Sequence, residues 1–216
     1  MRILACLSLI FLLAGCGTVN NALSEKTKRI EYYRIYDVKT SADKDQIIHA
    51  ASKGLGENVN NANESTPIPD FTEPPAKPGR FKLINPFGNT GMGSLLAANG
   101  IKLCSCDGAV WIAKANRNTK NSSDLNLTVC LFQYKGGYQV DEYAVFSKEE
   151  GGLMQLGRSL ANAMVGTPEE WTEKTLLDVV RNISRETHAD ISFVEGYPKI
   201  SGTPWLDSQD KSLSQK

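Results

Sequence analysis

The sequence predicts an α+β fold, in which helices pack on one face of an antiparallel sheet. Two dipeptides between apolar, strand-like segments indicate hairpins, Asp107-Gly108 and Gly136-Gly137, because a two-residue hairpin turn needs positive φ at both positions. After these strands, Thr167-Pro168-Glu169-Glu170 combines an N-cap residue, a proline at the first helical position and a glutamate placed for a capping box. Hairpins joined to helices with one apolar face give two layers, a sheet and its helices.

The folded part is expected to begin with a strand and a helix. Residues 30–38 are rich in aromatic and β-branched residues, which favour a strand. Thr40 or Ser41 can cap the helix that follows, which runs through about Leu55. Its apolar residues fall on one face: Ile47, Ile48, Ala51 and Leu55. Residues 58–80 are dominated by Asn, Pro, Glu and Thr, and we expect a long loop there because prolines interrupt a regular ladder.

The two hairpins together predict a four-stranded meander. Its strands are residues 101–106, 109–116, 125–135 and 138–147. Residues 81–84 are expected to add a short strand and residues 95–99 one helical turn. In the second hairpin, Lys135 is expected to pair with Tyr138. Side chains alternate between the two faces of a strand, so the core face would carry Leu127, Val129, Leu131, Val140, Ala144 and Phe146. With the strand at 30–38, the sheet is a meander plus an N-terminal strand.

Two helices and an edge strand are expected after the meander. The first helix has an apolar stripe made of Leu153, Leu156, Leu160 and Met164, and Gly166 ends it. The second helix starts at Pro168 and buries Leu176, Val179, Val180 and Ile183. Residues 191–194 are expected to add an edge strand, whereas residues 201–216 are expected to form a loose tail.

The N-terminus carries the clearest functional signal. Met1-Arg2 supplies a positive end, and residues 3–13 form an apolar run that is too short to span a bilayer. The run closes with Leu13-Ala14-Gly15-Cys16. This segment resembles the lipobox of bacterial lipoproteins, and the resemblance ends near Cys16. It implies cleavage before Cys16, lipidation of the Cys16 sulfur and amine, and stable attachment through several acyl chains.

The same resemblance implies a location and a domain organisation. Gly17 stands where lipoproteins of the inner membrane commonly have aspartate, so we expect the outer membrane, with the protein facing the periplasm. Residues 1–15 would be the signal peptide and residues 16–28 a lipidated tether. A single domain at 29–200 and a flexible tail at 201–216 would follow. The tether reaches at most about 40 Å, which favours a partner at the membrane face.

Composition and motifs argue against several classes of function. The formal net charge is zero at pH 7, and a chain without a long basic block lacks the signature of a nucleic-acid-binding protein. The sequence contains neither a nucleophile elbow nor a zinc-binding helix motif. His49 and His188 lie on predicted helices without the paired spacing of metal ligands. We therefore expect no catalytic residue, metal site or cofactor.

Three cysteines follow Cys16 in the mature chain: Cys104, Cys106 and Cys130. An odd number leaves at least one thiol free, buried or paired with another molecule. In a sequential meander Cys106 and Cys130 lie two strand spacings apart, which exceeds the Cα separation of a disulfide. Either the strand order is not sequential or this bridge is absent. A Cys104–Cys106 bridge would be strained and readily reduced.

These observations predict a non-catalytic lipoprotein that serves as an interaction or assembly module in the bacterial cell envelope. Its partners would be the membrane, through the lipid on Cys16, and an envelope protein. Two alternatives remain open. One is a periplasmic redox protein or enzyme that uses Cys104 and Cys106, although buried structural cysteines are more usual. The other is a carrier that holds a small ligand between the sheet and the helices.

Overall fold

The computed structural model describes residues 26–85, 87–88, 90–98, 102–119, 122–150 and 167–199. The lipobox Leu13-Ala14-Gly15-Cys16, the expected helix at 153–164 and the expected tail at 201–216 lie outside the described residues. Within the described part, no helix is both long enough and apolar enough to span a bilayer.

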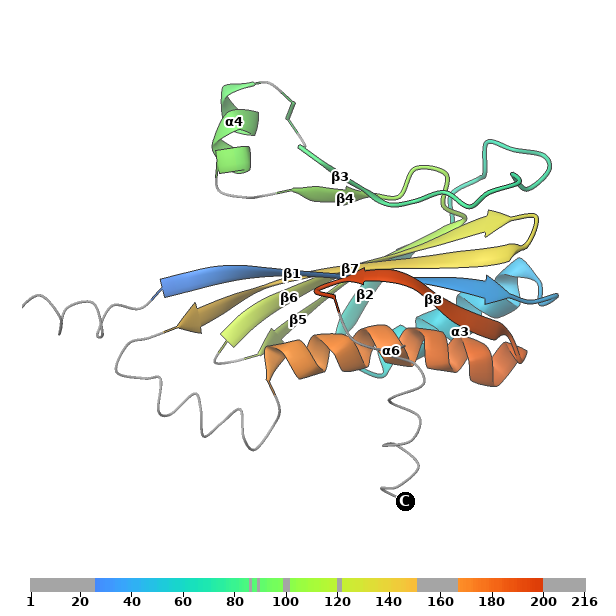
Figure 1. Cartoon of the computed structure of the whole chain (residues 1–216). Coiled ribbons are helices and arrows are strands. Elements are labelled where there is room, and N and C mark those ends of the chain that lie inside the picture. Colours follow the sequence, from blue (N-terminus) through green and yellow to red (C-terminus); the bar gives the residue numbers. More distant parts are fainter. Residues whose placement is uncertain are drawn as a thin grey trace, which may run out of the picture.

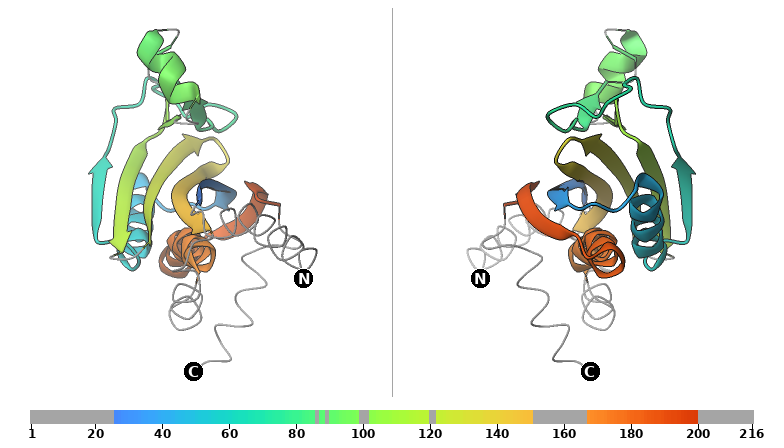
Figure 2. Two further views of the ribbon diagram at one scale, coloured as in Figure 1. Left: turned by 90° about the vertical axis from the view of Figure 1, so that its left-hand side faces the viewer. Right: turned by 90° about the vertical axis from the view of Figure 1, so that its right-hand side faces the viewer.

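The fold has two layers, an antiparallel sheet and two helices that cover one of its faces (Figure 1). The six strands have the order β2-β5-β6-β7-β1-β8. Their bounds are β1 (Lys26–Lys39), β2 (Asn61–Ser65), β5 (Trp111–Thr119), β6 (Ser122–Tyr134), β7 (Gly137–Glu150) and β8 (Asp190–Tyr197). The helices α3 (Lys44–Gly56) and α6 (Pro168–Thr187) pack side by side beneath the sheet (Figure 2). The predicted α+β class is therefore confirmed.

A smaller, two-stranded sheet stands on the side of the main sheet opposite the helices (Figure 1). It pairs β3 (Lys82–Ile84) with β4 (Leu103–Ser105), and α4 (Gly91–Ala98) lies in the connection between them. β3 matches the short strand expected at 81–84, whereas α4 begins four residues before the helical turn expected at 95–99. We call the described residues between 82 and 105 the arm, because both views of Figure 2 show β3, β4 and α4 projecting away from the main sheet.

The two helices begin at capping boxes, one predicted and one not. For α6, the Thr167 side chain accepts the Glu170 backbone N–H while Glu170 accepts the N–H of Thr167, as the sequence indicated. For α3, the expected cap at Thr40 or Ser41 is wrong, since the N-cap is Asp43. Asp43 and Gln46 exchange the same pair of bonds, whereas the Thr40 hydroxyl accepts the N–H of Ala42 in the preceding turn.

The expected four-stranded meander is wrong in its first strand. The Asp107-Gly108 turn forms, with φ of 84° at Gly108 and a bond from Ala109 N to Cys106 O. The strand before this turn, β4, nevertheless pairs with β3 and not with β5. The place beside β5 is taken by β2, so only β5, β6 and β7 are sequential neighbours in the main sheet. The turn signal is local and does not specify which strand pairs with which.

The second predicted hairpin forms with a shifted register. Tyr138 pairs with Gln133 rather than with Lys135, which is a shift of two residues. Because side chains alternate with a period of two, this shift leaves every side chain on the expected face. The six residues expected on the core face are all buried: Leu127, Val129, Leu131, Val140, Ala144 and Phe146.

The ends of the sheet extend beyond the segments that the sequence suggested. β1 begins at Lys26, inside the expected tether at 16–28. β2 lies inside the expected loop at 58–80, and all five of its residues are exposed. β8 forms the edge strand expected around 191–194, pairing with β1. The main sheet therefore ends in a short, polar strand on one side and in β8 on the other.

The core lies between the main sheet and the two helices. It includes Ile47, Ala51 and Leu55 from α3, and Leu176, Val179, Val180 and Ile183 from α6. The two helices are in close contact at Gly54, which is buried. A Cβ atom at Gly54 would lie 2.8 Å from the Cα of Val179 and closer still to the Asp178 carbonyl oxygen. The backbone of α6 occupies the space that a side chain at Gly54 would need.

Gly54→Ala should therefore destabilise the fold by about 1 to 3 kcal/mol, because the added methyl group meets backbone atoms that cannot rotate away. Gly56→Ala is the matched control, since a Cβ atom at Gly56 has no atom within 4 Å. That substitution should leave stability unchanged or raise it slightly, because alanine favours the helix. Denaturant unfolding of both variants measures the difference. Equal changes in the free energy of unfolding for the two variants would show that α3 and α6 can move apart without loss of stability.

Candidate functional site

The segment before the arm crosses the outer face of the main sheet, the face not covered by helices. Gly79 lies against the Phe132 ring, where a Cβ atom would come within 2.5 Å of the ring. The Gly79 carbonyl accepts a bond of 2.9 Å from Gln139 Nε2. The Phe81 ring then packs between Tyr33 and Tyr143, with ring centroids 5.6 and 5.8 Å away. These contacts fix the start of the arm on β1, β6 and β7.

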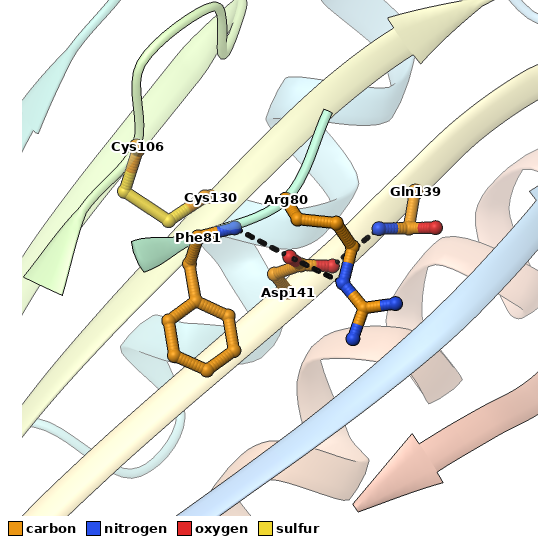
Figure 3. Close-up of a disulfide and its surroundings, with 6 residues drawn as sticks. All are labelled: Arg80, Phe81, Cys106, Cys130, Gln139 and Asp141. Carbon is orange, nitrogen blue, oxygen red and sulfur yellow. Dashed lines mark hydrogen bonds and ion pairs between the residues drawn. A yellow bond between two sulfur atoms is a disulfide. The ribbon is translucent and has the colours of Figure 1, made fainter. Parts of the chain in front are cut away.

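Asp141 of β7 is the polar anchor of this segment (Figure 3). Its carboxylate accepts the backbone N–H of Phe81 at 2.8 Å and the side-chain amide of Gln139 at 2.8 Å, and Arg80 Nε lies 3.7 Å away. The Asp141 side chain is fully buried. Burial raises its pKa to about 6, although the bonds from Phe81 and Gln139 oppose the shift. The carboxylate therefore serves to hold the chain at Phe81 rather than to face solvent.

A disulfide fixes the other end of the arm. Cys106, directly after β4, is bonded to Cys130 of β6, with their Cα atoms 5.7 Å apart. Figure 3 shows this disulfide beside the Phe81–Asp141 contact. Of the two possibilities that the sequence left open, the structure has the non-sequential strand order. Cys106 stands above β6 because β4 leaves the main sheet, so the separation expected for a meander does not apply.

Cys104 is the remaining thiol of the three, and it is free and half-buried. The strained Cys104–Cys106 bridge considered from the sequence does not form. The three sulfur atoms nevertheless lie within 4.8 Å of one another, and they are the one cluster of metal-ligand type among the described residues. Two of them are already bonded to each other, so this disulfide form offers no thiolate set for a metal. Burial raises the pKa of Cys104 to about 12, and the negative charge of Asp141 adds to the shift.

The arm beyond these two attachments carries most of the large apolar side chains that are exposed on the described part of the chain. They are Leu83, Ile84, Phe87, Met92, Leu95 and Leu103. Outside the arm, the exposed large apolar residues are Ile68, Val194 and Tyr197. Contiguous exposed apolar surface marks sites of protein or membrane contact. The arm is therefore the candidate functional site of this fold.

A second polar cluster is buried on the helix side of the sheet. The guanidinium of Arg34 is 1% exposed and pairs with both carboxylate oxygens of Glu173 on α6, at 3.1 and 2.6 Å. It also donates to the carbonyl oxygens of Tyr33, Tyr197 and Pro198. Glu142 lies opposite Arg34 in the pairing of β1 with β7, and neither of its buried carboxyl oxygens has a hydrogen-bond partner. Burial, and then the negative charge of Glu173, hold the pKa of Glu142 well above its ordinary value of 4.5.

Glu142→Gln should stabilise the protein by an amount that grows with pH. A carboxyl group with a raised pKa in the fold ionises more easily in the unfolded chain, so its contribution to stability falls as pH rises above 4.5. The difference between variant and wild type should be small near pH 4. It should increase by about 1.4 kcal/mol per pH unit until the folded-state pKa is passed. Unfolding curves over this pH range measure it, and a constant difference would contradict a buried neutral acid.

The other residues considered from the sequence are dispersed. Cys16 lies outside the described residues. His188 forms the C-cap of α6 with φ of 53°, and His49 lines a depression with Gln46 and Glu186. The sequence suggests solvated strand positions for Asp141 and Glu142, which is wrong, since both are fully buried, and it gives no sign of the role of Arg34. These charged residues come together only through the strand register and the packing of α6 on the sheet. Neither the register nor this packing can be predicted from a local sequence pattern.

Two depressions on the surface bear on the small-ligand alternative. One has a volume of about 350 Å³ and lies across β2, β5 and β6, with Asn61, Lys114 and Asn126 in its lining. The other, of about 360 Å³, lies where the end of α6 meets the start of α3. Neither is in the middle of the interface between the sheet and the helices, where the apolar side chains of the core pack together. The expectation of a ligand in that interface gains no support from either depression.

Comparisons with known proteins identify no family for this chain. No protein-family model and no curated protein matches the chain. Among solved structures, an uncharacterised protein from Rhizobium leguminosarum is 12% identical, and the match covers 76% of this chain and 98% of that chain with a TM-score of 0.30. A likeness at this level establishes neither a shared fold nor a function.

Proposed function

We propose that this protein is a lipoprotein of the bacterial outer membrane that faces the periplasm and serves as a non-catalytic interaction or assembly module of the cell envelope. The anchor part rests on the sequence, where Leu13-Ala14-Gly15-Cys16 resembles a lipobox. The interaction part is supported by one structural observation, the arm. Six large apolar side chains project from it while both of its ends are fixed to the main sheet.

The construction of the arm supports a role in contact rather than in folding. An apolar segment that helps to build a core is buried, and burying a large side chain gains about 1.5 to 3 kcal/mol. Four side chains of the arm are 50 to 59% exposed: Phe87, Met92, Leu95 and Leu103. Contacts within the chain therefore provide no more than half of the free energy that full burial of these side chains would give. A surface of this kind is stabilised when another molecule covers it.

The anchor is tested with the native, full-length protein beside a Cys16→Ser variant. The native protein should carry the added mass of acyl chains and fractionate with the outer membrane, whereas the variant should lack that mass and lose stable attachment. A native protein of unmodified mass would overturn the anchor. The non-catalytic role would be overturned by turnover of an envelope substrate that a single side-chain substitution abolishes.

A second candidate is a periplasmic thiol–disulfide protein, favoured by the closeness of the three sulfur atoms. In such a protein the Cys104 thiolate would attack one sulfur of the Cys106–Cys130 bond. A new disulfide would form as the other cysteine leaves as a thiolate, with no net oxidation. Attack requires the thiolate, and the raised pKa of Cys104 opposes its formation.

Thiol counting separates this candidate from the structural role of the cysteines. For residues 16–216 with Cys16→Ser, Cys104 should resist alkylation near pH 7 in the folded state. It should be the single reactive thiol after unfolding without a reductant, and Cys106 and Cys130 should join it after reduction. Rapid alkylation of folded Cys104, or Cys104 found in a disulfide by peptide mapping, would instead favour exchange.

A further inference from the structure

The apolar character of the arm extends all the way round α4. This helix has the sequence GMGSLLAA, in which Ser94 is the single side chain with a hydrogen-bonding group. Met92, Leu95 and Ala98 follow one another at intervals of three and, with Ser94, form one exposed face of α4. On the opposite side Gly93 is buried and Leu96 is half-buried. A helix without a charged face is typical of a buried or membrane environment. Figure 2 shows α4 standing clear of the main sheet, so the sheet does not cover the exposed face.

Charge is absent from the arm over the same stretch and returns at the lysines on either side of it. Residues 83–101 contain no Asp, Glu, Lys, Arg or His, and this stretch is bordered by Lys82 and Lys102. Both lysines are exposed. Lys82 pairs with Ser105 at the base of the β3–β4 ladder, whereas Lys102 precedes Leu103, which pairs with Ile84 at the end of the ladder nearer α4. Lysine side chains are long enough to reach phosphate groups while the apolar side chains beside them contact acyl chains.

We propose that the arm inserts into the interface of a lipid bilayer, with the tip around α4 among the acyl chains and Lys82 and Lys102 at the level of anionic headgroups. The exposed apolar side chains of the arm come from β3, from the turn at Phe87, from α4 and from β4. The arm carries Lys82 and Lys102 and has no acidic residue, so its charge complements an anionic bilayer surface. The two fixed ends of the arm make insertion orient the whole domain on the membrane.

This inference deepens the proposed function, and one part of it rests on the proposed anchor. From Cys16 to Lys26, where β1 begins, the chain reaches at most about 35 Å. A lipid on Cys16 would therefore hold the arm near the same membrane, so that even weak insertion becomes effective through a high local concentration. The arm would then fix how the domain faces its envelope partner, which attachment through Cys16 alone would not do.

The experiment uses residues 16–216 with Cys16→Ser, which keep every described helix and strand and lack the proposed anchor. The chain is mixed with vesicles of phosphatidylcholine and phosphatidylglycerol, and its bound fraction is measured by flotation. The wild-type arm should bind, and Met92→Asp combined with Leu95→Asp should weaken binding about tenfold or more. Ile68→Asp combined with Val194→Asp is the matched control, because these exposed apolar residues lie outside the arm. The control should bind as the wild type does.

The lysines are tested separately by Lys82→Gln combined with Lys102→Gln. This variant should lose affinity for vesicles that contain phosphatidylglycerol while keeping its affinity for pure phosphatidylcholine. The electrostatic part of the wild-type binding should also weaken with added salt. Circular dichroism and thermal unfolding of each variant confirm that the fold is kept.

The experiment gives different results if the arm contacts something other than lipid. No flotation of the wild-type arm, or equal flotation of the Met92 and Leu95 variant, would overturn the inference. So would a dimer in solution that these two substitutions dissociate, because a second copy would then cover the arm. The anchor is judged independently from the acyl mass of the native protein. An acylated native protein whose Cys16→Ser chain does not float would leave the proposed function intact and remove only the inserted arm.

Discussion

Replacing Glu173 by leucine is expected to destabilise the protein by about 3 to 5 kcal/mol, because it leaves the charge of Arg34 without its counter-ion inside the fold. The Glu173 side chain is 25% exposed, but the guanidinium of Arg34 is only 1% exposed. The Glu173→Leu variant therefore keeps a buried guanidinium charge that neither a carboxylate nor water can stabilise.

Removing Arg34 instead should cost less stability, since the Glu173 carboxylate that remains is partly hydrated. Arg34→Met should cost about 1 to 3 kcal/mol, from the unpaired carbonyl oxygens of Tyr33, Tyr197 and Pro198.

A further prediction concerns Glu142, whose substitution should have opposite effects on stability with and without Glu173. In the wild type the Glu173 charge raises the pKa of Glu142 and the Arg34 charge lowers it. Without Glu173, Arg34 should favour an ionised Glu142, which lies opposite it across β1 and β7. Glu142→Gln should therefore stabilise the wild type near neutral pH but destabilise the Glu173→Leu variant. Denaturant unfolding of the two single variants and the double variant measures this change of sign.

A matched control comes from a second ion pair between the sheet and α6. Lys148 and Glu169 are 2.6 Å apart, with side chains 34% and 28% exposed. Because both charges reach solvent, Glu169→Leu should cost about 1 kcal/mol or less. A cost for Glu169→Leu as large as for Glu173→Leu would mean that burial of the Arg34 guanidinium does not decide the effect.

The elements that the sequence predicted are those whose signals are local. The α6 capping box needs only Thr167 and Glu170, and the core face of β6 and β7 needs only the alternation of apolar residues, which a register shift of two preserves. The cap of α3 is also local, but several capping residues precede this helix. The choice of Asp43 over Thr40 depends on its reciprocal bonds with Gln46.

The arrangement of strands could not be predicted because it depends on pairings distant in the sequence. β2 has no apolar alternation, since all five of its side chains are exposed at the sheet edge, so the segment resembles the loop around it. Its pairing with β5 decides that β4 leaves the main sheet, and this in turn decides which cysteines meet. The exposure of the apolar side chains on the arm could not be predicted either, because it too depends on the three-dimensional arrangement of the chain. Apolar residues such as Met92 and Leu95 are usually buried, and only the fold shows that these are not.

Replacing both Cys106 and Cys130 by alanine is expected to lower the stability by about 3 to 4 kcal/mol, because the bond closes a loop between residues 24 apart in the sequence. Alanine avoids placing a hydroxyl group among the apolar neighbours of these buried cysteines. Denaturant unfolding without reductant measures the loss. Cys104→Ala is the control, since this thiol closes no loop, and it should cost about 1 kcal/mol or less. A similar cost for both variants would mean that side-chain packing, and not the covalent link, is responsible.

Hydrogen exchange distinguishes two ways in which this disulfide can act. Restricting the unfolded chain alone would lower the global stability and leave the folded arm as firmly attached as before. The disulfide also attaches one end of the arm, while the contacts of Gly79 and Phe81 with the main sheet attach the other. Without the disulfide, the arm is attached at one end only and can move away from the sheet by local opening. The Phe81 amide should then exchange well before the amides of α6. Unchanged protection at Phe81 relative to α6 would show that Asp141 and the aromatic contacts of Phe81 hold the arm without the disulfide.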